Sequence, residues 1–329
     1  MKSAQIYCTA LEMIQDMKLD GFDASVIEHI EAASRTVEHD VGKFIPSLET
    51  RSFKGHCGHL SPIGPVISIS KILNDDVEVT LFSLLPDVPL WEDGPYLKVD
   101  ADVYWGESVE ITGLWAKYSR VKALGISASL ALAATELTVT DGSLLCPGMV
   151  LLIDAEQVLV LEGIGSVKSP APIAAVSTIS VANIASEEII NVTNGAEFHA
   201  GETLQIGVED LFIRKISGNQ LYVSRGWNNT PASDQLAGAA ISVYRTFLVD
   251  RGMNGTIDAE HTDAALQRYM PPEDVNYLCR QIAGLMHKKA SSGFIGRIGD
   301  ATSGEGGYFS EFPPNQIDRV RLHYKIWSF

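Results

Sequence analysis

The chain has 329 residues, of which 46% are hydrophobic and 20% charged, a composition that can bury a core and is not typical of a disordered chain. Its formal net charge of −16 argues against a surface built to grip nucleic-acid phosphates, although DNA can still slide past an acidic wall. The sequence has no run of about 18 apolar residues, and its first twenty residues carry acids where a signal peptide needs an apolar core. We therefore expect synthesis in the cytoplasm and no membrane partner.

Two helices are predicted in the first segment, residues 1–58. The apolar residues of the first recur at helical spacing and would form one stripe: Ile6, Ala10, Met13, Ile14 and Met17. Ser25 and Glu28 have the spacing of a capping box, which announces a second helix that should end before Pro46.

After residue 58 the sequence pattern changes from helical to β-type. Residues 59–126 contain short β-type runs separated by turns and are predicted to form hairpins, and the β pattern continues to residue 270. Helix returns in residues 271–299, where Pro271, Pro272, Glu273 and Asp274 are typical of a first helical turn. Three helices that cannot bury their stripes alone should pack together. The predicted fold is therefore α+β, with a small helical core from both chain ends and large β-rich insertions.

Two segments of the β-rich part are related. Residues 137–160 and 190–213 align without a gap at an offset of 53, and the alignment matches Thr140 with Thr193, Gly142 with Gly195, Gly148 with Gly201, Ile153 with Ile206 and Glu156 with Glu209. However, the turns VSRGWNNT at 223–230 and VDRGMNGT at 249–256 are only 26 residues apart. Tandem copies cannot satisfy both spacings. Nesting can: a first unit at 127–163 and 246–270 would enclose a second unit at 180–245.

The repeated Arg-Gly turns allow two interpretations. Arginines can hold a phosphate or carboxylate in an active site. Duplication of the whole turn favours a structural role, in which Arg225 and Arg251 pair with acids such as Glu209 and Glu156 or with backbone carbonyls. In that role Gly226 and Gly252 supply a backbone conformation that a side chain would obstruct. The remaining turn residues, Asn228, Asn254, Thr230 and Thr256, are then expected to bond to the turn's own backbone.

Few residues suggest catalysis or metal binding. His56, Cys57 and His59 form one local cluster of metal-ligand types, but the second pair of ligands that zinc sites usually draw from another segment is missing. The four cysteines, Cys8, Cys57, Cys146 and Cys279, form no Cys-x-x-Cys pair and are expected to be reduced core residues. Phosphate-loop, nucleophile-elbow and zinc-protease motifs do not occur. We therefore expect no enzyme activity, no cofactor and no metal.

Four segments in chain order resemble the head-to-tail connector, or adaptor, proteins of tailed bacteriophages. They are residues 27–53, 109–119, 249–261 and 271–300. The resemblance covers nearly the whole chain, which departs from the family pattern by its large β insertions, above all the nested unit. It implies a helical core without catalytic activity and a ring of about twelve copies, whose head-to-tail interfaces close under the portal protein. A distal neck, stopper or tail protein would be the next partner, DNA would pass through the channel without specific binding, and the protein would reside in the virion neck.

The resemblance also implies that the C-terminal tail, residues 300–329, reaches toward the portal. Apolar and basic or polar residues alternate from Arg319 to Ile326, a period of two that predicts an extended strand added to a partner's sheet or to this chain's own β units. The candidate docking residues are Arg319, Arg321, Tyr324, Lys325, Ile326, Trp327 and Phe329. The alternative function is a tail- or fibre-associated binding module, in which the duplicated β units contact carbohydrate or a host surface.

Overall fold

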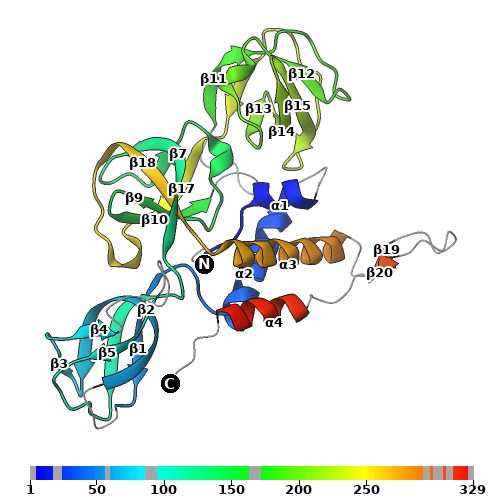
Figure 1. Ribbon diagram of the computed structural model, residues 1–329. Helices are drawn as coiled ribbons and strands as arrows, with labels where there is room; N and C mark the ends of the chain where they lie inside the picture. Colours follow the sequence, from blue (N-terminus) through cyan, green and yellow to red (C-terminus); the bar gives the residue numbers. More distant parts are fainter. Residues whose placement is uncertain are drawn as a thin grey trace. The chain divides into compact units, whose positions relative to one another are not determined.

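The computed structural model describes residues 5–17, 24–55, 60–85, 95–162, 172–291, 297–298, 307–308 and 314–324 (Figure 1). Helices from both ends of this part of the chain accompany three six-stranded antiparallel sheets, so the predicted α+β fold is confirmed. The chain divides into two compact units. One comprises Met1–Ala33, Ala123–Arg268 and Arg280–Phe309, and the other Ser34–Lys122, Tyr269–Cys279 and Ser310–Phe329.

Helix α1 (Ala10–Met17) begins later than its apolar stripe predicted. The hydroxyl of Thr9 accepts a hydrogen bond from the Glu12 amide at 3.2 Å, and the Glu12 carboxylate accepts one from the Thr9 amide at 2.9 Å. This reciprocal pair is a capping box that fixes the start of the helix. Ile6 lies before it and donates its backbone N–H to the carbonyl of Gly148 at 3.0 Å.

Helices α2 (Ala24–Asp40) and α3 (Glu273–Ser291) pack together although they lie far apart in the sequence (Figure 1). The Ser34 hydroxyl lies 3.4 Å from the Cys279 sulfur, and the rings of His29 and His287 meet edge to face at 5.6 Å. Their facing stripes are at most 1% exposed and consist of Val26, Ile30, Ala33, Val37, Val275, Leu278 and Ile282. Burial of each large aliphatic side chain contributes about 1.5–3 kcal/mol, which stabilises the helical core.

The first sheet follows α2. Its strands are β1 (Ser47–Phe53), β2 (Leu60–Asn74), β3 (Val77–Glu78), β4 (Ser83–Leu85), β5 (Tyr96–Asp100) and β6 (Val109–Trp115). They are arranged in the order β1-β6-β2-β5-β4, with β3 paired to β2. Asp75 and Asp76 have positive φ and make the tight turn between β2 and β3. The core of this sheet is centred on Trp115, Ile111 and Val66.

The other two sheets are copies of one fold. The first β unit contains β7 (Arg120–Leu130), β8 (Glu136–Thr138), β9 (Val150–Ile153), β10 (Glu156–Glu162), β17 (Thr246–Asp250) and β18 (His261–Met270). The nested β unit contains β11 (Ile173–Thr178), β12 (Ile189–Asn191), β13 (Thr203–Ile206), β14 (Glu209–Ser217), β15 (Gln220–Trp227) and β16 (Ala240–Val243).

Their sheet orders are β7-β18-β9-β10-β17-β8 and β11-β16-β13-β14-β15-β12. Counted along each unit, both read first, sixth, third, fourth, fifth, second. The nested β unit therefore interrupts the first between its fourth and fifth strands, as the two spacings predicted. Even the short 3-10 turns correspond, because Asp141 and Asn194 cap them through the amides of Ser143 and Ala196.

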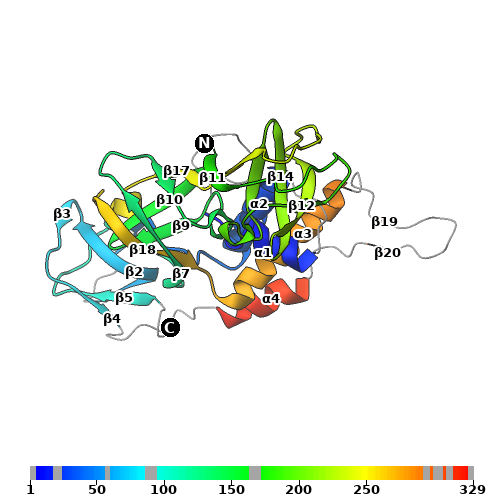
Figure 2. The same ribbon diagram turned by 90° about the horizontal axis from the view of Figure 1, so that it is seen from above.

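The C-terminal tail corrects the predicted strand. Residues Pro314–His323 form helix α4, which lies alongside α3 in both views (Figures 1 and 2). Val320 and Tyr324 fit the predicted alternation, but they are also four residues apart and form the buried face of a helix. Pro314 at the first helical position is a start signal that the alternation obscured.

The nested β unit should be removable. Ile173 and Val243 are paired neighbours on β11 and β16, so the unit's two ends lie side by side. In the test variant, a short glycine linker replaces residues 173–243, and Arg245→Gln removes the cation that would otherwise lose its partner Glu202. We expect the first β unit of this variant to remain folded. Circular dichroism should show one cooperative thermal transition. A broad, non-cooperative loss of signal would contradict independent folding.

Candidate functional site

Each Arg-Gly turn is organised by a buried ion pair. Arg225 donates from Nε and Nη2 to the two carboxylate oxygens of Glu209, both at 2.7 Å. Arg251 makes the same two bonds to Glu156 at 2.9 and 2.7 Å. The two glutamates are at most 1% exposed. These are the pairs predicted from the sequence, and their two-point geometry is the strongest form of arginine–carboxylate contact.

The remaining arginine donors bind backbone carbonyls, and Arg225 Nη1 also donates to the side-chain oxygen of Asn183 at 2.6 Å. Arg225 Nη1 donates to Ile184 and Glu187, both at 3.0 Å, and Nη2 donates to Ser233 at 2.5 Å. In the first β unit, Arg251 donates in the same way to the carbonyls of Ala131, Leu132 and Ala259. Each guanidinium therefore ties its strand to two separate loops. A group engaged in this way holds the chain together and has little capacity left for a ligand.

The turn glycines have the backbone conformation predicted for them. Gly226 and Gly252 have φ of 62° and 58°, in the left-handed region that L side chains rarely adopt. Their amides donate to Glu209 and Glu156 at 3.1 and 3.3 Å. Glycine at these positions therefore lets the backbone itself bind the buried carboxylate.

The turn threonines bond to the turn backbone as predicted. The Thr230 hydroxyl donates to the Trp227 carbonyl at 2.7 Å, and that of Thr256 donates to Met253 at 2.8 Å. The prediction for Asn228 was wrong, because its amide donates to Asp210 on the neighbouring strand at 3.1 Å. Asn254 donates to Gln157, also on a neighbouring strand, at 2.7 Å.

The hydrogen bonds control the charge of the buried acids. Burial alone would raise the pKa of Glu156, but the bonds from Arg251 and His261 outweigh it and lower that pKa to about 2. In the nested β unit burial opposes the bonds from Arg225 and the amides of Ser233 and Gly226, which lower the pKa of Glu209. Both carboxylates are therefore ionised at neutral pH, when each pairs with its arginine.

The two networks differ at the position of His261. His261 places Nε2 2.8 Å from Glu156 and Nδ1 2.8 Å from Asp154, whereas Gln235, its counterpart 26 residues earlier, donates to Glu209 at 3.0 Å. Both ring nitrogens of His261 can donate to carboxylates only when the imidazole is protonated. Burial opposes this charge, but the bonds to Glu156 and Asp154 raise the pKa of His261 above its ordinary value. The sequence comparison missed the equivalence of His261 and Gln235 because the two side chains are chemically different.

A third buried ion pair joins the two β units. Glu202 is fully buried and accepts bonds from Arg245 Nε at 2.6 Å and Nη2 at 2.9 Å. It also accepts from the amide of Gly142 in the first β unit at 3.0 Å and from the amide of His199 at 2.8 Å. The ring of His199 and the carboxylate of Asp141 lie close enough to share a cation with Glu202. Because Arg245 and two backbone amides already bind the Glu202 carboxylate, we assign Asp141, His199 and Glu202 a structural role at the junction of the two β units.

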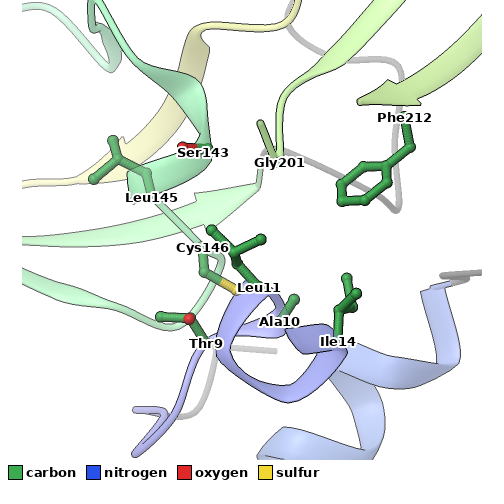
Figure 3. Close-up of a pocket in the computed structure, with 9 residues that line it drawn as sticks. All are labelled: Thr9, Ala10, Leu11, Ile14, Ser143, Leu145, Cys146, Gly201 and Phe212. Atoms are coloured by element: carbon green, nitrogen blue, oxygen red, sulfur yellow. The ribbon is translucent and has the colours of Figure 1, made fainter. Parts of the chain in front are cut away.

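The first helix also meets this junction (Figure 3). Leu11 and Ile14 of α1 lie opposite Leu145 of the first β unit and Phe212 of the nested β unit, around a cavity of about 20 Å³. That volume suits about one water molecule and no organic ligand. Cys146 lines it, and burial raises the pKa of this thiol to about 12, so the sulfur stays protonated. The cavity is thus a packing gap.

The docking residues predicted in the tail fall into two groups. Arg319, Arg321 and Tyr324 belong to α4 or follow it directly, whereas Lys325, Ile326, Trp327 and Phe329 lie outside the described residues. Arg319 is exposed, and Arg321 donates to the carbonyl of Asp40 at 2.8 Å. The described part of the tail therefore forms a helical base.

Tyr324 anchors that base. Its hydroxyl donates to Asp274 at 2.9 Å, and its ring packs edge to face on Phe44 at 5.0 Å. Its carbonyl accepts from Lys117, which also donates to the carbonyl of Val41. Burial lowers the pKa of Lys117, whose ammonium lies at the C-terminal ends of α2 and α4, where the helix dipoles favour a cation. The sequence carried no clear signal for this anchor.

The three metal-ligand types His56, Cys57 and His59 lie outside the described residues. Within the described part of the chain, no helix is both long and apolar enough to cross a membrane. Comparison with models of protein families, with curated proteins and with solved structures finds no match.

The buried arginines can be tested by truncation. Arg225→Ala or Arg251→Ala leaves a buried glutamate without its cation, and we expect a loss of about 3–5 kcal/mol in the free energy of unfolding of the affected unit, measured by urea denaturation. Arg214→Ala is the matched control, since Arg214 pairs with the exposed Glu188 and should change stability by at most about 1 kcal/mol. Equal effects of all three substitutions would contradict the structural role.

His261 predicts a pH dependence. Its pKa is raised by folding, so its contribution is fully present below the unfolded value of about 6.5 and is lost as pH rises through the folded value. His261→Gln, which installs the nested copy's residue, should cost about 1–3 kcal/mol at pH 5.5 and progressively less at alkaline pH. Urea melts of both proteins across this range measure the difference. A constant difference would show that His261 does not titrate as inferred.

Proposed function

We propose that this protein is a structural component of a tailed-bacteriophage neck, where copies form a ring that joins the capsid portal to the tail and leaves a passage for DNA. The proposal rests on the resemblance of four segments to head-to-tail connectors. The same resemblance implies no enzymatic role.

The observation that carries the proposal is the closure of the helical core by both chain ends. Helix α2 comes from the first quarter of the chain, and α3 and α4 come from the last. Arg321 and Tyr324 fasten α4 to the Asp40 carbonyl and the Asp274 side chain. A connector needs a rigid base from which a short segment can reach a neighbour, and this arrangement supplies one immediately before Lys325.

The portal-docking segment is revised accordingly. Residues 319–324 serve as the base, and the proposed contact is made by Lys325, Ile326, Trp327 and Phe329. An aromatic or large aliphatic residue that fills a partner's pocket is the usual anchor of a protein interface. Deletion of the chain from Pro314 onward would remove the buried Val320 and Tyr324 and could not distinguish docking from folding.

The acidic composition supports passage of DNA. A net charge of −16 would repel phosphates if acids face the channel, so the genome could slide without sticking. A basic wall would hold DNA with a steep dependence on salt. The proposed channel therefore binds DNA weakly and without sequence preference.

The test is assembly on the portal protein of the same phage. We expect the full chain to bind purified portal rings in a sedimentation assay, and deletion of residues 325–329 to weaken binding by about tenfold or more while the melting temperature stays unchanged. Ile257→Ser is the control, because Ile257 is 85% exposed on the first β unit and lies outside the proposed docking segment. Unimpaired binding of the deletion variant would place docking elsewhere, and failure of the full chain to bind would contradict the connector function. Binding to glycans in place of the portal would favour the alternative binding module.

A further inference from the structure

Four exposed aliphatic residues lie near one backbone pairing of the nested β unit. Asn183 and Gln235 pair through reciprocal backbone bonds of 2.9 and 2.7 Å, and the Asn183 side chain donates to the carbonyl of Ile189. Next to these residues, the following side chains face solvent: Val181, 57% exposed; Ile184, 56%; Ile189, 41%; and Leu236, 74%. We call these four the aliphatic patch. Adjacent exposed aliphatic groups are typical of a surface that another molecule covers.

The first β unit shows that the fold does not require this patch. At the offset of 53, the positions of Val181, Ile184 and Ile189 correspond to Ala128, Ala131 and Glu136 of the first β unit. At the offset of 26, the position of Leu236 corresponds to Thr262. The two sheets have the same strand order and equivalent buried networks, so each position can be compared directly. These four aliphatic residues are therefore specific to the nested copy, although the first β unit exposes Leu132 beside Ala131.

The rim of the aliphatic patch is acidic. Glu187, Glu188 and Asp234 are exposed beside it, and the equivalent residues of the first β unit are Ala134, Thr135 and Glu260. Arg214 pairs with Glu188, which leaves the rim with a negative balance. An aliphatic centre with this rim fits a partner that combines an apolar side chain with flanking cations.

This chain carries such a surface on α4. Val320 and Tyr324 bury one face of the helix, and the other face presents Leu322, which is 66% exposed. Arg319 lies three residues before Leu322, on the same side of the helix, and is exposed. Arg321 and His323 flank Leu322, but Arg321 pairs with Asp318 at 3.2 Å and His323 lies 3.1 Å from Asp274, so Arg319 is the cation that this face offers to a partner. The outer face of α4 therefore combines an aliphatic centre, Leu322, with the cation of Arg319.

We propose that the aliphatic patch of one copy receives the outer face of α4 from a second copy. The proposal rests on the ring proposed above and names the contact that builds it. Two different surfaces meet, so the interface is heterologous and can continue from copy to copy until a ring closes. One aliphatic cluster is small beside the roughly 800 Å² per partner of a stable interface. A single contact between two copies is therefore weak, and the closed ring is stabilised by the sum of its contacts.

Cysteine trapping tests the contact. Two variants, Ile184→Cys and Leu322→Cys, are each made in a chain that also carries Cys57→Ser; the described cysteines Cys8, Cys146 and Cys279 are buried. Mixing the two and oxidising should give a disulfide-linked dimer, whereas either variant alone should not. Ile257→Cys mixed with Leu322→Cys is the matched control, because Ile257 is 85% exposed on the first β unit. We expect at least about tenfold less dimer from it.

The outcomes separate the contact from the function. A dimer formed by Ile184→Cys alone would mean that the aliphatic patches of two copies contact each other. Equal dimer yields with Ile257→Cys would mean that the cross-link forms by random collision. Either result, or the absence of any dimer, would overturn the proposed contact. Rings that form on the portal without this cross-link would contradict the contact and leave the connector function standing. Cross-linked copies that never bind the portal would support the contact and contradict the function.

Discussion

The two β units depend on one interaction, a buried arginine that binds a buried glutamate at two points. A carboxylate removed from water is costly unless its charge is matched and its oxygens are hydrogen-bonded. Glu156 and Glu209 meet both conditions, because each binds a guanidinium, the amide of a glycine in a left-handed turn and a further loop amide. The glycine, the arginine and the loop must all be in place together. This mutual requirement explains why the whole Arg-Gly turn was duplicated and not its arginine alone.

The same interaction explains how one copy can sit inside the other. The nested β unit enters and leaves through neighbouring strands, so it interrupts the first β unit without separating the strands that meet at the Glu156 network. Its own polar network is satisfied around Glu209. At the junction, Glu202 and Arg245 repeat the buried pairing of carboxylate and guanidinium. Once its fold was secured in this way, the nested copy could acquire surface residues that the first copy lacks.

Local periodicity and the constant offset predicted much of the fold from the sequence. The apolar stripes of α2 and α3 and the alignment at 53 residues depend on patterns that neighbouring residues repeat. The C-terminal helix was mispredicted because Val320 and Tyr324 satisfy a strand period and a helical period equally, and contacts with Asp274, Phe44 and Lys117 select the helix. Those partners lie far away in the sequence. The His261 and Gln235 pair was missed for a similar reason, since only the three-dimensional network shows that the two side chains do the same work.

The proposed role of this protein is that of a ring component at the neck of a phage particle. Electron cryomicroscopy of the neck in assembled particles would test this role. We expect a closed ring of copies beneath the portal, with the helical core in the ring and a continuous channel along its axis. Particles in which this chain is absent from the neck, or is attached as separate copies to the tail or fibres, would contradict it.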